Sequence, residues 1–166
     1  MFSGSTSLTT APSLPAETLA ENCYDEMFLG CTKLTKAPKL PAKTLASYCY
    51  KSMFSGCKAL ATAPELPAET LAEHCYDEMF SYCSKLTNLP ELPDYFQFLA
   101  TGCFKGMFQN CTALETAPEL SAYQLGENCC QNMFYGCTSL ETAPMLHVVF
   151  SLAANCFESM FYGCTS

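Results

Sequence analysis

The dipeptide Met-Phe recurs along this chain at a nearly constant spacing. It begins at Met1, Met27, Met53, Met79, Met107, Met133 and Met160. Successive occurrences are therefore 26, 26, 26, 28, 26 and 27 residues apart. A fixed period in this range is typical of repeat proteins, in which each unit packs only on its neighbours. We therefore expect residues 1–166 to form a single array of about six units of 26–28 residues.

Two leucine positions recur in every unit. The first row is Leu14, Leu40, Leu66, Leu92, Leu120 and Leu146, and the second is Leu19, Leu45, Leu71, Leu99, Leu125 and Leu152. Because a position that is the same in every unit faces the same neighbours, these rows predict one continuous core along the array.

The spacing of apolar residues within a unit predicts a helix. They fall on one stripe at 3.6 residues per turn, and in the first unit they are Ala16, Leu19, Ala20, Cys23 and Met27. We expect a helix from about Pro15 to Phe28, with Gly30 at its end. The threonine-rich segment Leu8–Ala11 reads as a short strand that Pro12 ends. The sequence therefore predicts an α/β solenoid with short parallel strands on one face and helices on the other.

Twelve of the 13 cysteines form two rows, and Cys130 is the extra one. The first row is Cys23, Cys49, Cys75, Cys103, Cys129 and Cys156, and the second is Cys31, Cys57, Cys83, Cys111, Cys137 and Cys164. A disulfide between equivalent positions would strain the bond, and the spacing lacks the Cys-x-x-Cys pattern of zinc sites. We therefore predict a buried ladder of reduced thiols and no metal.

Charge and composition exclude several classes of function. The net charge is −8, with 16 acids against eight lysines and no arginine. Arginine is the preferred residue for phosphate recognition, so neither nucleic acid nor an anionic membrane is an expected partner. No apolar run approaches the roughly 18 residues of a membrane span, and residues 1–10 lack the features of a signal peptide.

The sequence contains no constellation typical of an enzyme. His74 and His147 lie at non-equivalent positions of the unit, and Cys75, next to His74, is expected to point into the core. A catalytic base needs a placed nucleophile and an orienting acid. We therefore expect no enzymatic activity and no cofactor. A row of Glu65, Glu91 and Glu119 could attract a cation such as calcium or a basic partner, but a solvated surface is the preferred interpretation.

The block Met-Phe-x-Gly-Cys-Thr-x-Leu, at residues 27–34 and again at 133–140, resembles the BspA-like bacterial surface leucine-rich repeats. The resemblance implies a leucine-rich-repeat solenoid with parallel strands on a concave face and helices on a convex face. It also implies a cell-surface or secreted protein that binds a macromolecule without catalysis, with host matrix proteins as candidate partners. The alternative is a structural spacer that projects another domain from the cell surface. Because both ends of the chain fall within a unit, we expect a fragment of a longer array.

Two groups of residues are candidates for partner binding. The first varies beside the predicted strands and consists of Thr10, Lys36, Thr62, Asn88, Thr116 and Thr142, together with Glu115 and Glu141. The second is the aromatic cluster Tyr95, Phe96 and Phe98, in the unit that carries two extra residues. Insertions of this kind often lie on the binding face of a repeat array. The alternative is that these aromatic side chains refill the core where the Pro-Ala-Glu-Thr pattern is lost.

Overall fold

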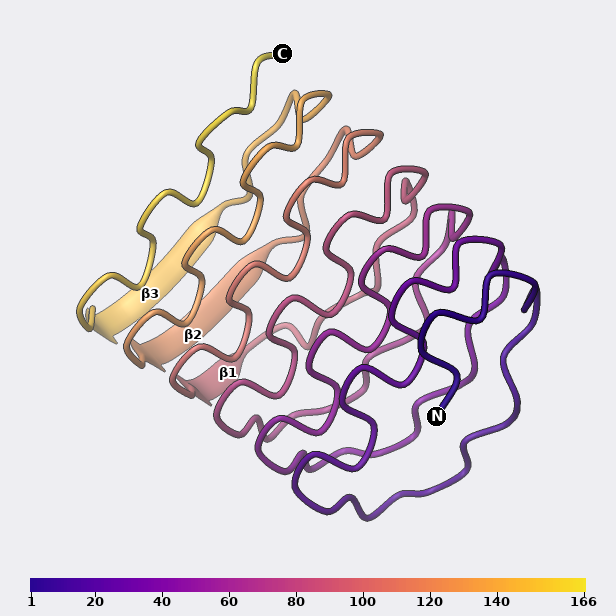
Figure 1. Cartoon of the computed structure of the whole chain (residues 1–166). Helices are drawn as coiled ribbons and strands as arrows, with labels where there is room; N and C mark the ends of the chain where they lie inside the picture. The colour runs from indigo at the N-terminus through magenta and orange to yellow at the C-terminus, as the bar shows by residue number, and fades with distance from the viewer.

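The computed structural model describes residues 1–166, except for the side chain of Val149. The chain winds into stacked coils, one for each repeat, and the two termini lie toward opposite ends of the stack (Figure 1). We number the coils from the repeated leucine that opens each one: coil 1 is residues 8–33, coil 2 is 34–59, coil 3 is 60–85, coil 4 is 86–113, coil 5 is 114–139 and coil 6 is 140–166.

Three regular strands occur within the described residues. They are β1 (Phe96–Leu99), β2 (Leu120–Leu125) and β3 (Leu146–Ser151), which form a parallel sheet in the order β1-β2-β3. No helix occurs among the described residues. The predicted α/β class, with helices on a convex face, is therefore wrong, and the segment Pro15–Phe28 is not helical.

A wall of stacked turns replaces the predicted helices. We call residues 20–31 and their equivalents in later coils the turn wall. Asn22, Glu26 and Gly30 have positive φ angles of 57°, 51° and 69°, a conformation that interrupts a right-handed helix. Met27 N donates to Tyr24 O at 3.2 Å, as in a β-turn. The wall is therefore a chain of turns, with positive φ at every fourth residue.

Backbone hydrogen bonds of the turn wall alternate between its own coil and the next one. Phe28 N donates to Met53 O at 2.9 Å, and Phe54 N donates to Met79 O at 2.9 Å. The residue on the C-terminal side of each phenylalanine instead bonds within its own turn. Neighbouring coils are thus joined by a ladder that resembles the pairing of parallel strands.

Buried residues of the turn wall recur every four residues, which explains the mistaken helix. In coil 2 they occur as the pairs Cys49-Tyr50 and Met53-Phe54, followed by Cys57, and each is at most 1% exposed. A four-residue period and the 3.6-residue period of a helix differ little over two turns. The apolar stripe therefore matched a helix although the backbone repeats as turns.

Proline decides where the regular strands form. In coils 1–3 the second residue after the opening Ala-Pro is a buried leucine, and another proline follows it, at Pro15, Pro41 and Pro67. Coils 5 and 6 have Ser121 and His147 at this position, inside β2 and β3. Because proline has no N–H to donate to a ladder, regular pairing appears only where it is missing. In coil 4 the strand β1 begins three residues after Pro93.

The predicted strand Leu8–Ala11 and its equivalents are reduced to isolated bridges. Three such bridges join the residues beside the opening prolines: Thr10 to Lys36, Thr62 to Asn88, and Thr116 to Thr142. These pairs still hold neighbouring coils in register, so the repeats are aligned residue by residue.

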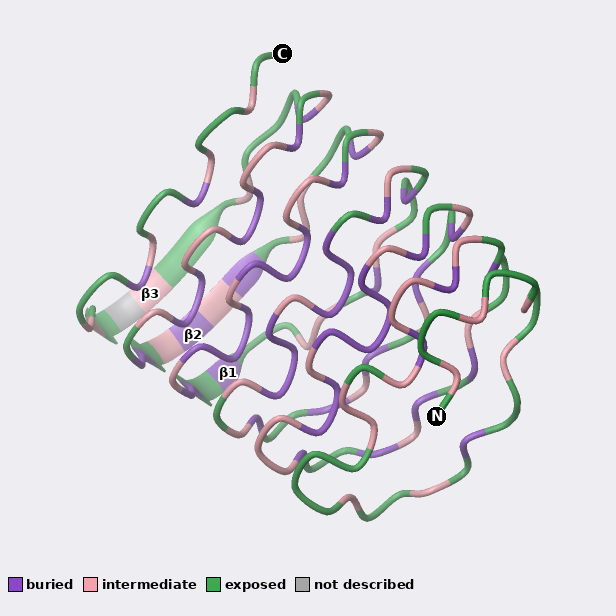
Figure 2. Ribbon diagram, in the orientation of Figure 1, coloured by how far each residue is buried: buried purple, intermediate pink, exposed green. Residues whose placement is uncertain are grey.

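The core consists of ladders of identical side chains. Phe28, Phe54 and Phe80 are fully buried and stack with ring centroids 5.5–5.6 Å apart. Buried residues recur at matching places from coil to coil (Figure 2). Each aromatic pair contributes about 0.5–1.5 kcal/mol beyond its buried area. The stacking that aligns the coils therefore also adds to the packing energy of the core.

Candidate functional site

The predicted row of variable residues is brought together on the surface. Thr10, Lys36, Thr62, Asn88, Thr116 and Thr142 are all exposed. Thr35 Oγ1 donates to Thr9 O at 3.1 Å, and Asn88 Nδ2 donates to Thr62 Oγ1 at 3.3 Å. Glu141 N donates to Glu115 O at 3.0 Å, which places these two exposed residues side by side. The row is a continuous polar strip, and its role in binding stays a prediction.

The aromatic residues of the coil 4 insertion divide between core and surface. Phe96 is 1% exposed and packs edge-on against Phe104, with centroids 5.9 Å apart. It therefore fills the core, as the alternative interpretation expected, and it is not available to a partner. Tyr95 and Phe98 are each 47% exposed and remain candidate contacts.

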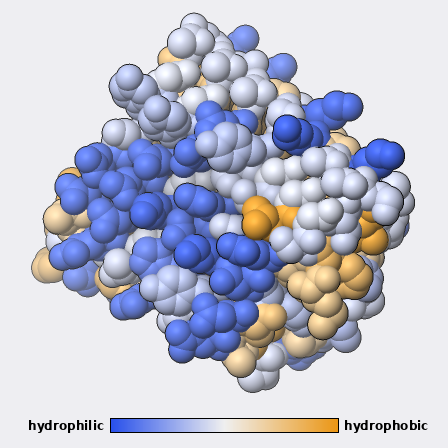
Figure 3. Space-filling view, viewed as in Figure 1, coloured by the Kyte–Doolittle hydropathy of each residue, from blue (hydrophilic) through white to orange (hydrophobic). Residues whose placement is uncertain are grey.

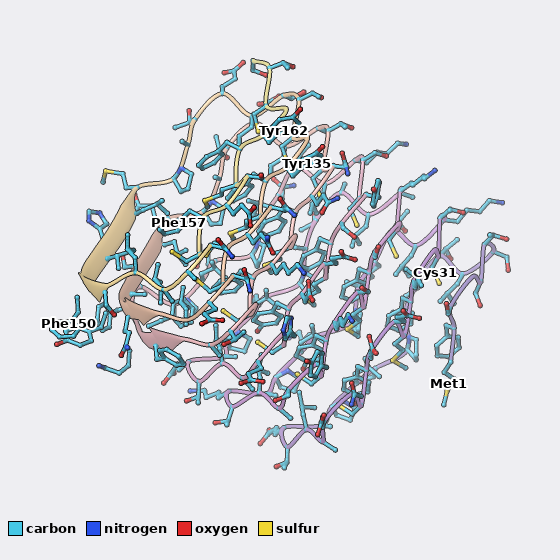
Figure 4. The ribbon with its side chains drawn as sticks, turned by 60° about the vertical axis from the view of Figure 1, so that its left-hand side comes forward. Met1, Cys31, Tyr135, Phe150, Phe157 and Tyr162 are labelled. Carbon is cyan, nitrogen blue, oxygen red and sulfur yellow. The ribbon has the colours of Figure 1, made fainter. Side chains whose placement is uncertain are left out.

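Sequence reasoning missed the aromatic pair that continues this surface. Tyr123 in β2 and Phe150 in β3 stack with centroids 5.2 Å apart. Phe150 is 71% exposed and points away from the body of the molecule beside β3 (Figure 4). The replacement of the coil pattern by His-Val-Val-Phe at residues 147–150 was the available signal, because it adds a large apolar side chain outside the repeated core positions.

The second row of cysteines makes hydrogen bonds between coils. Cys57 Sγ donates to Phe28 O at 3.2 Å, and Cys83 Sγ donates to Phe54 O at 3.2 Å. The same contact to a phenylalanine carbonyl of the preceding coil recurs at Cys31, Cys111, Cys137 and Cys164, at 3.1–3.2 Å. These thiols are therefore donors as well as buried apolar groups. Ser5, which occupies this row near the N-terminus, was the sequence signal for a donor.

Burial keeps these thiols protonated. All 13 cysteines are free thiols in the structure. Desolvation raises the pKa of Cys49, Cys57 and Cys137 to about 12. A thiolate is the reactive form of cysteine, so these residues are inert near neutral pH. Two thiols differ from these three: a side-chain hydrogen bond with Cys130 lowers the pKa of Cys129, and Cys23 is exposed.

His74 takes part in a structural pair. Its Nδ1 donates to Asp77 Oδ2 at 3.0 Å, and its ring stacks on Tyr48 with centroids 5.0 Å apart. Desolvation raises the pKa of Asp77 despite the hydrogen bond from His74. Cys75 is fully buried, and its side chain forms no hydrogen bond with this pair among the described residues.

A series of grooves opens next to the polar row, along a strip that we call the proline face: residues 37–41 of coil 2 and their equivalents. The largest groove, of about 560 Å³, lies between coils 4 and 5 and is lined by residues 87–94 and 116–121 apart from residue 120. A second, of about 320 Å³, lies between coils 3 and 4, and a third, of about 360 Å³, between coils 2 and 3. Predicted binding residues line two of these grooves, namely Asn88 and Thr116 in the largest and Lys36 in the third.

Hydrophilic side chains cover much of the face seen in Figure 3, and a hydrophobic area lies where Figure 1 places the N-terminal coils.

Within the described part of the chain, no group of three or more His, Cys, Asp or Glu side chains is arranged to hold a metal ion. The same residues include no helix with the length and apolar character needed to cross a membrane.

The fold and these surfaces define a repeat protein whose stacked coils carry extended lateral strips. No protein-family model and no curated protein matches the chain. Among solved structures, it is similar to a leucine-rich repeat protein from Bacteroides ovatus, with 20% identity and a TM-score of 0.37. The similarity covers 93% of this chain and 55% of that one, so this chain spans just over half of that protein's length. A likeness this distant assigns neither fold nor function.

Proposed function

We propose that this chain is a non-enzymatic binding protein that recognises a macromolecular partner through its lateral surface. The observation that supports the proposal is the continuity of that surface. The row from Thr10 to Thr142 and the grooves of the proline face both run across several coils. An extended partner can make many modest contacts along such strips, which is how repeat proteins usually bind.

The leucine-rich-repeat character and the place of action are also proposals. The sequence block at residues 27–34 resembles BspA-like surface proteins, and this resemblance favours a secreted or cell-surface protein with a host matrix protein as partner. A structural spacer is the alternative function. The uniform backbone ladder between coils, with bonds such as Tyr50 N to Cys75 O at 3.0 Å, favours it because it would make the array a regular rod.

Binding of the purified 166-residue chain to surface-immobilised matrix proteins tests the proposal. We expect saturable binding that weakens when Glu115→Lys and Glu141→Lys reverse the charge of the polar strip. The matched control is Glu73→Lys with Glu127→Lys, two exposed acids outside the strip. Absence of binding to every matrix protein would favour the spacer. If both double variants lose binding equally, the polar strip is not the binding site.

A further inference from the structure

The three grooves of the proline face lie in one row, which we call the channel. Glu65 and Pro67 line both the groove between coils 2 and 3 and the groove between coils 3 and 4. Glu91 and Pro93 line both the latter and the large groove between coils 4 and 5. Because neighbouring grooves share lining residues, the channel crosses four coils as a row of adjoining depressions.

Proline is the cause of this channel. Among the described residues, none of residues 64–68 forms a backbone hydrogen bond with a neighbouring coil, although Ala63 N donates to Asn88 O at 3.0 Å just before them. Pro64 and Pro67 have no N–H to donate. The ladder that closes the rest of the coil is therefore open here, and a depression remains between coils.

The channel wall favours ligands that donate hydrogen bonds and carry positive charge. Five exposed carboxylates line it from coils 3 to 5, namely Glu65, Glu69, Glu91, Asp94 and Glu119. Lysine occurs only at the coil 2 end of the lining, at Lys36 and Lys39. The prolines remove backbone donors from the same wall. The lining therefore combines a depression with negative charge over most of its length, and Lys43 Nζ lies 3.7 Å from Glu69 Oε1 near the coil 2 end.

The charge selects the occupant. A second copy of this chain carries a net charge of −8 and would be repelled. Calcium is not favoured, because the described carboxylates do not form a cluster suited to a metal ion. A chain lying across four coils spaced about 4.8 Å apart covers about 14 Å, which corresponds to four or five extended residues at about 3.3 Å each.

We propose that this channel binds an extended, lysine- or arginine-containing peptide segment of a partner protein. The inference rests on the proposed binding function and specifies the chemistry of the partner. The cationic side chains pair with Glu65, Glu91 and Glu119, and the peptide N–H groups donate into the acceptor-rich wall. Such an interaction weakens as salt rises, because exposed charge pairs are screened.

Fluorescence anisotropy with a labelled octapeptide of alternating lysine and serine tests the inference on the intact 166-residue chain. Peptides with glutamine or glutamate in place of lysine serve as ligand controls. We expect only the lysine peptide to bind, with affinity falling as sodium chloride rises. The variant Glu65→Gln, Glu91→Gln, Glu119→Gln should weaken binding by about tenfold or more.

The matched control variant is Glu21→Gln, Glu73→Gln, Glu127→Gln. It removes the same charge from three exposed positions outside the channel and should change affinity by less than about twofold. Equal weakening in both variants would overturn the inference, since it would show attraction to net charge alone. Equal binding of the glutamine peptide, or calcium binding in calorimetry without peptide binding, would also overturn it. If the chain binds a matrix protein that the lysine peptide does not displace, the binding function stands and this channel is not its site.

Discussion

At the scale of single residues, position within the ladder decides what each side chain does. Cys83 and Cys75 are both fully buried thiols of the same coil. Only Cys83 donates a side-chain hydrogen bond to the preceding coil, at 3.2 Å to Phe54 O. Two cysteines that look equivalent in the sequence are therefore predicted to respond differently to substitution.

Replacing Cys83 separates its donor role from its apolar role. Cys83→Ala should lower the free energy of unfolding by about 1–3 kcal/mol, because it leaves a cavity and removes the donor to Phe54 O. Cys83→Ser should be milder, because a hydroxyl can still donate. At Cys75 the order should reverse, because a serine hydroxyl is buried there without a partner. Urea titrations of the four variants measure this, and the same order at both positions would contradict the donor role.

The carboxylate of Asp77 predicts a dependence of stability on pH. Burial raises its pKa, so the folded state disfavours the charged form. This contribution to stability is fully present below the unfolded pKa of about 3.9 and is lost as pH rises through the higher folded value. Asp77→Asn keeps an oxygen for the hydrogen bond from His74. It should therefore raise the free energy of unfolding at neutral pH and change it little at pH below about 4.

Thermal unfolding across the pH range tests this prediction, with Asp94→Asn as a control at an exposed position. A loss of stability in Asp77→Asn at neutral pH would show that the charge of Asp77 stabilises the fold through His74.

Two exceptions to the repeat pattern meet at Phe104. Phe96 stands where the paired residue of β2 is Ala122, and it packs on Phe104. Cys130 follows Phe104 in the row that otherwise holds aromatic rings, Tyr24, Tyr50 and Tyr76 among them. We interpret the large Phe96 and the small Cys130 as a compensating pair.

Phe96→Ala should lower the free energy of unfolding by about 3–5 kcal/mol, and Cys130→Phe by about 1–3 kcal/mol through overpacking. The double variant restores the alanine and the aromatic ring of the standard unit, so it should lose less than the sum. Urea denaturation of the four proteins gives the coupling energy. Additivity within about 0.5 kcal/mol would mean that the two sites pack independently.

At the scale of elements, the sequence predicted the period and the core rows but not the backbone. In the predicted leucine rows, Leu40, Leu66 and Leu120 are at most 3% exposed, but the prediction was wrong for Leu146 and Leu152 of coil 6, which are 37% and 64% exposed. The predicted helix was wrong because apolar pairs every four residues resemble a helical stripe. The positive φ angles of Glu26, Ser52 and Glu78 could not be predicted from the sequence, because glutamate and serine also occur in helices. Of the candidate site, the threonine strip was predictable from the repeat, but the channel was not, since it arises from missing hydrogen bonds.

The element most sensitive to one residue is β2. Ser121→Pro gives coil 5 the Leu-Pro-Ala sequence of coils 1–3, so the core should accept it. Because proline cannot join the ladder, we expect the amides of Leu120–Leu125 to exchange with solvent at least about tenfold faster. Ser121→Ala is the control. Unchanged protection of β2, measured by hydrogen exchange, would mean that proline does not determine where the strands form.

At the scale of the whole molecule, the coils form one stack whose sides differ in structure. Stacked aromatic rings such as Phe80 and Phe108, 5.8 Å apart, join successive coils inside the turn wall. On the proline face, residues 64–68 form no backbone hydrogen bond with a neighbouring coil among the described residues, and exposed carboxylates line the grooves there. The same repeat therefore has a hydrogen-bonded wall of turns on one side and open grooves on the other.

The central claim is that the Met-Phe segments are turns hydrogen-bonded to the next coil. Residue-specific nuclear Overhauser effects test it most directly. The account predicts contacts between the amide of Phe54 and residues 79–80, 25–26 positions along the chain, because Phe54 N donates to Met79 O at 2.9 Å. It also predicts positive φ at Ser52. Continuous contacts between residues three and four apart over 45–54, with negative φ throughout, would show a helix and contradict the account.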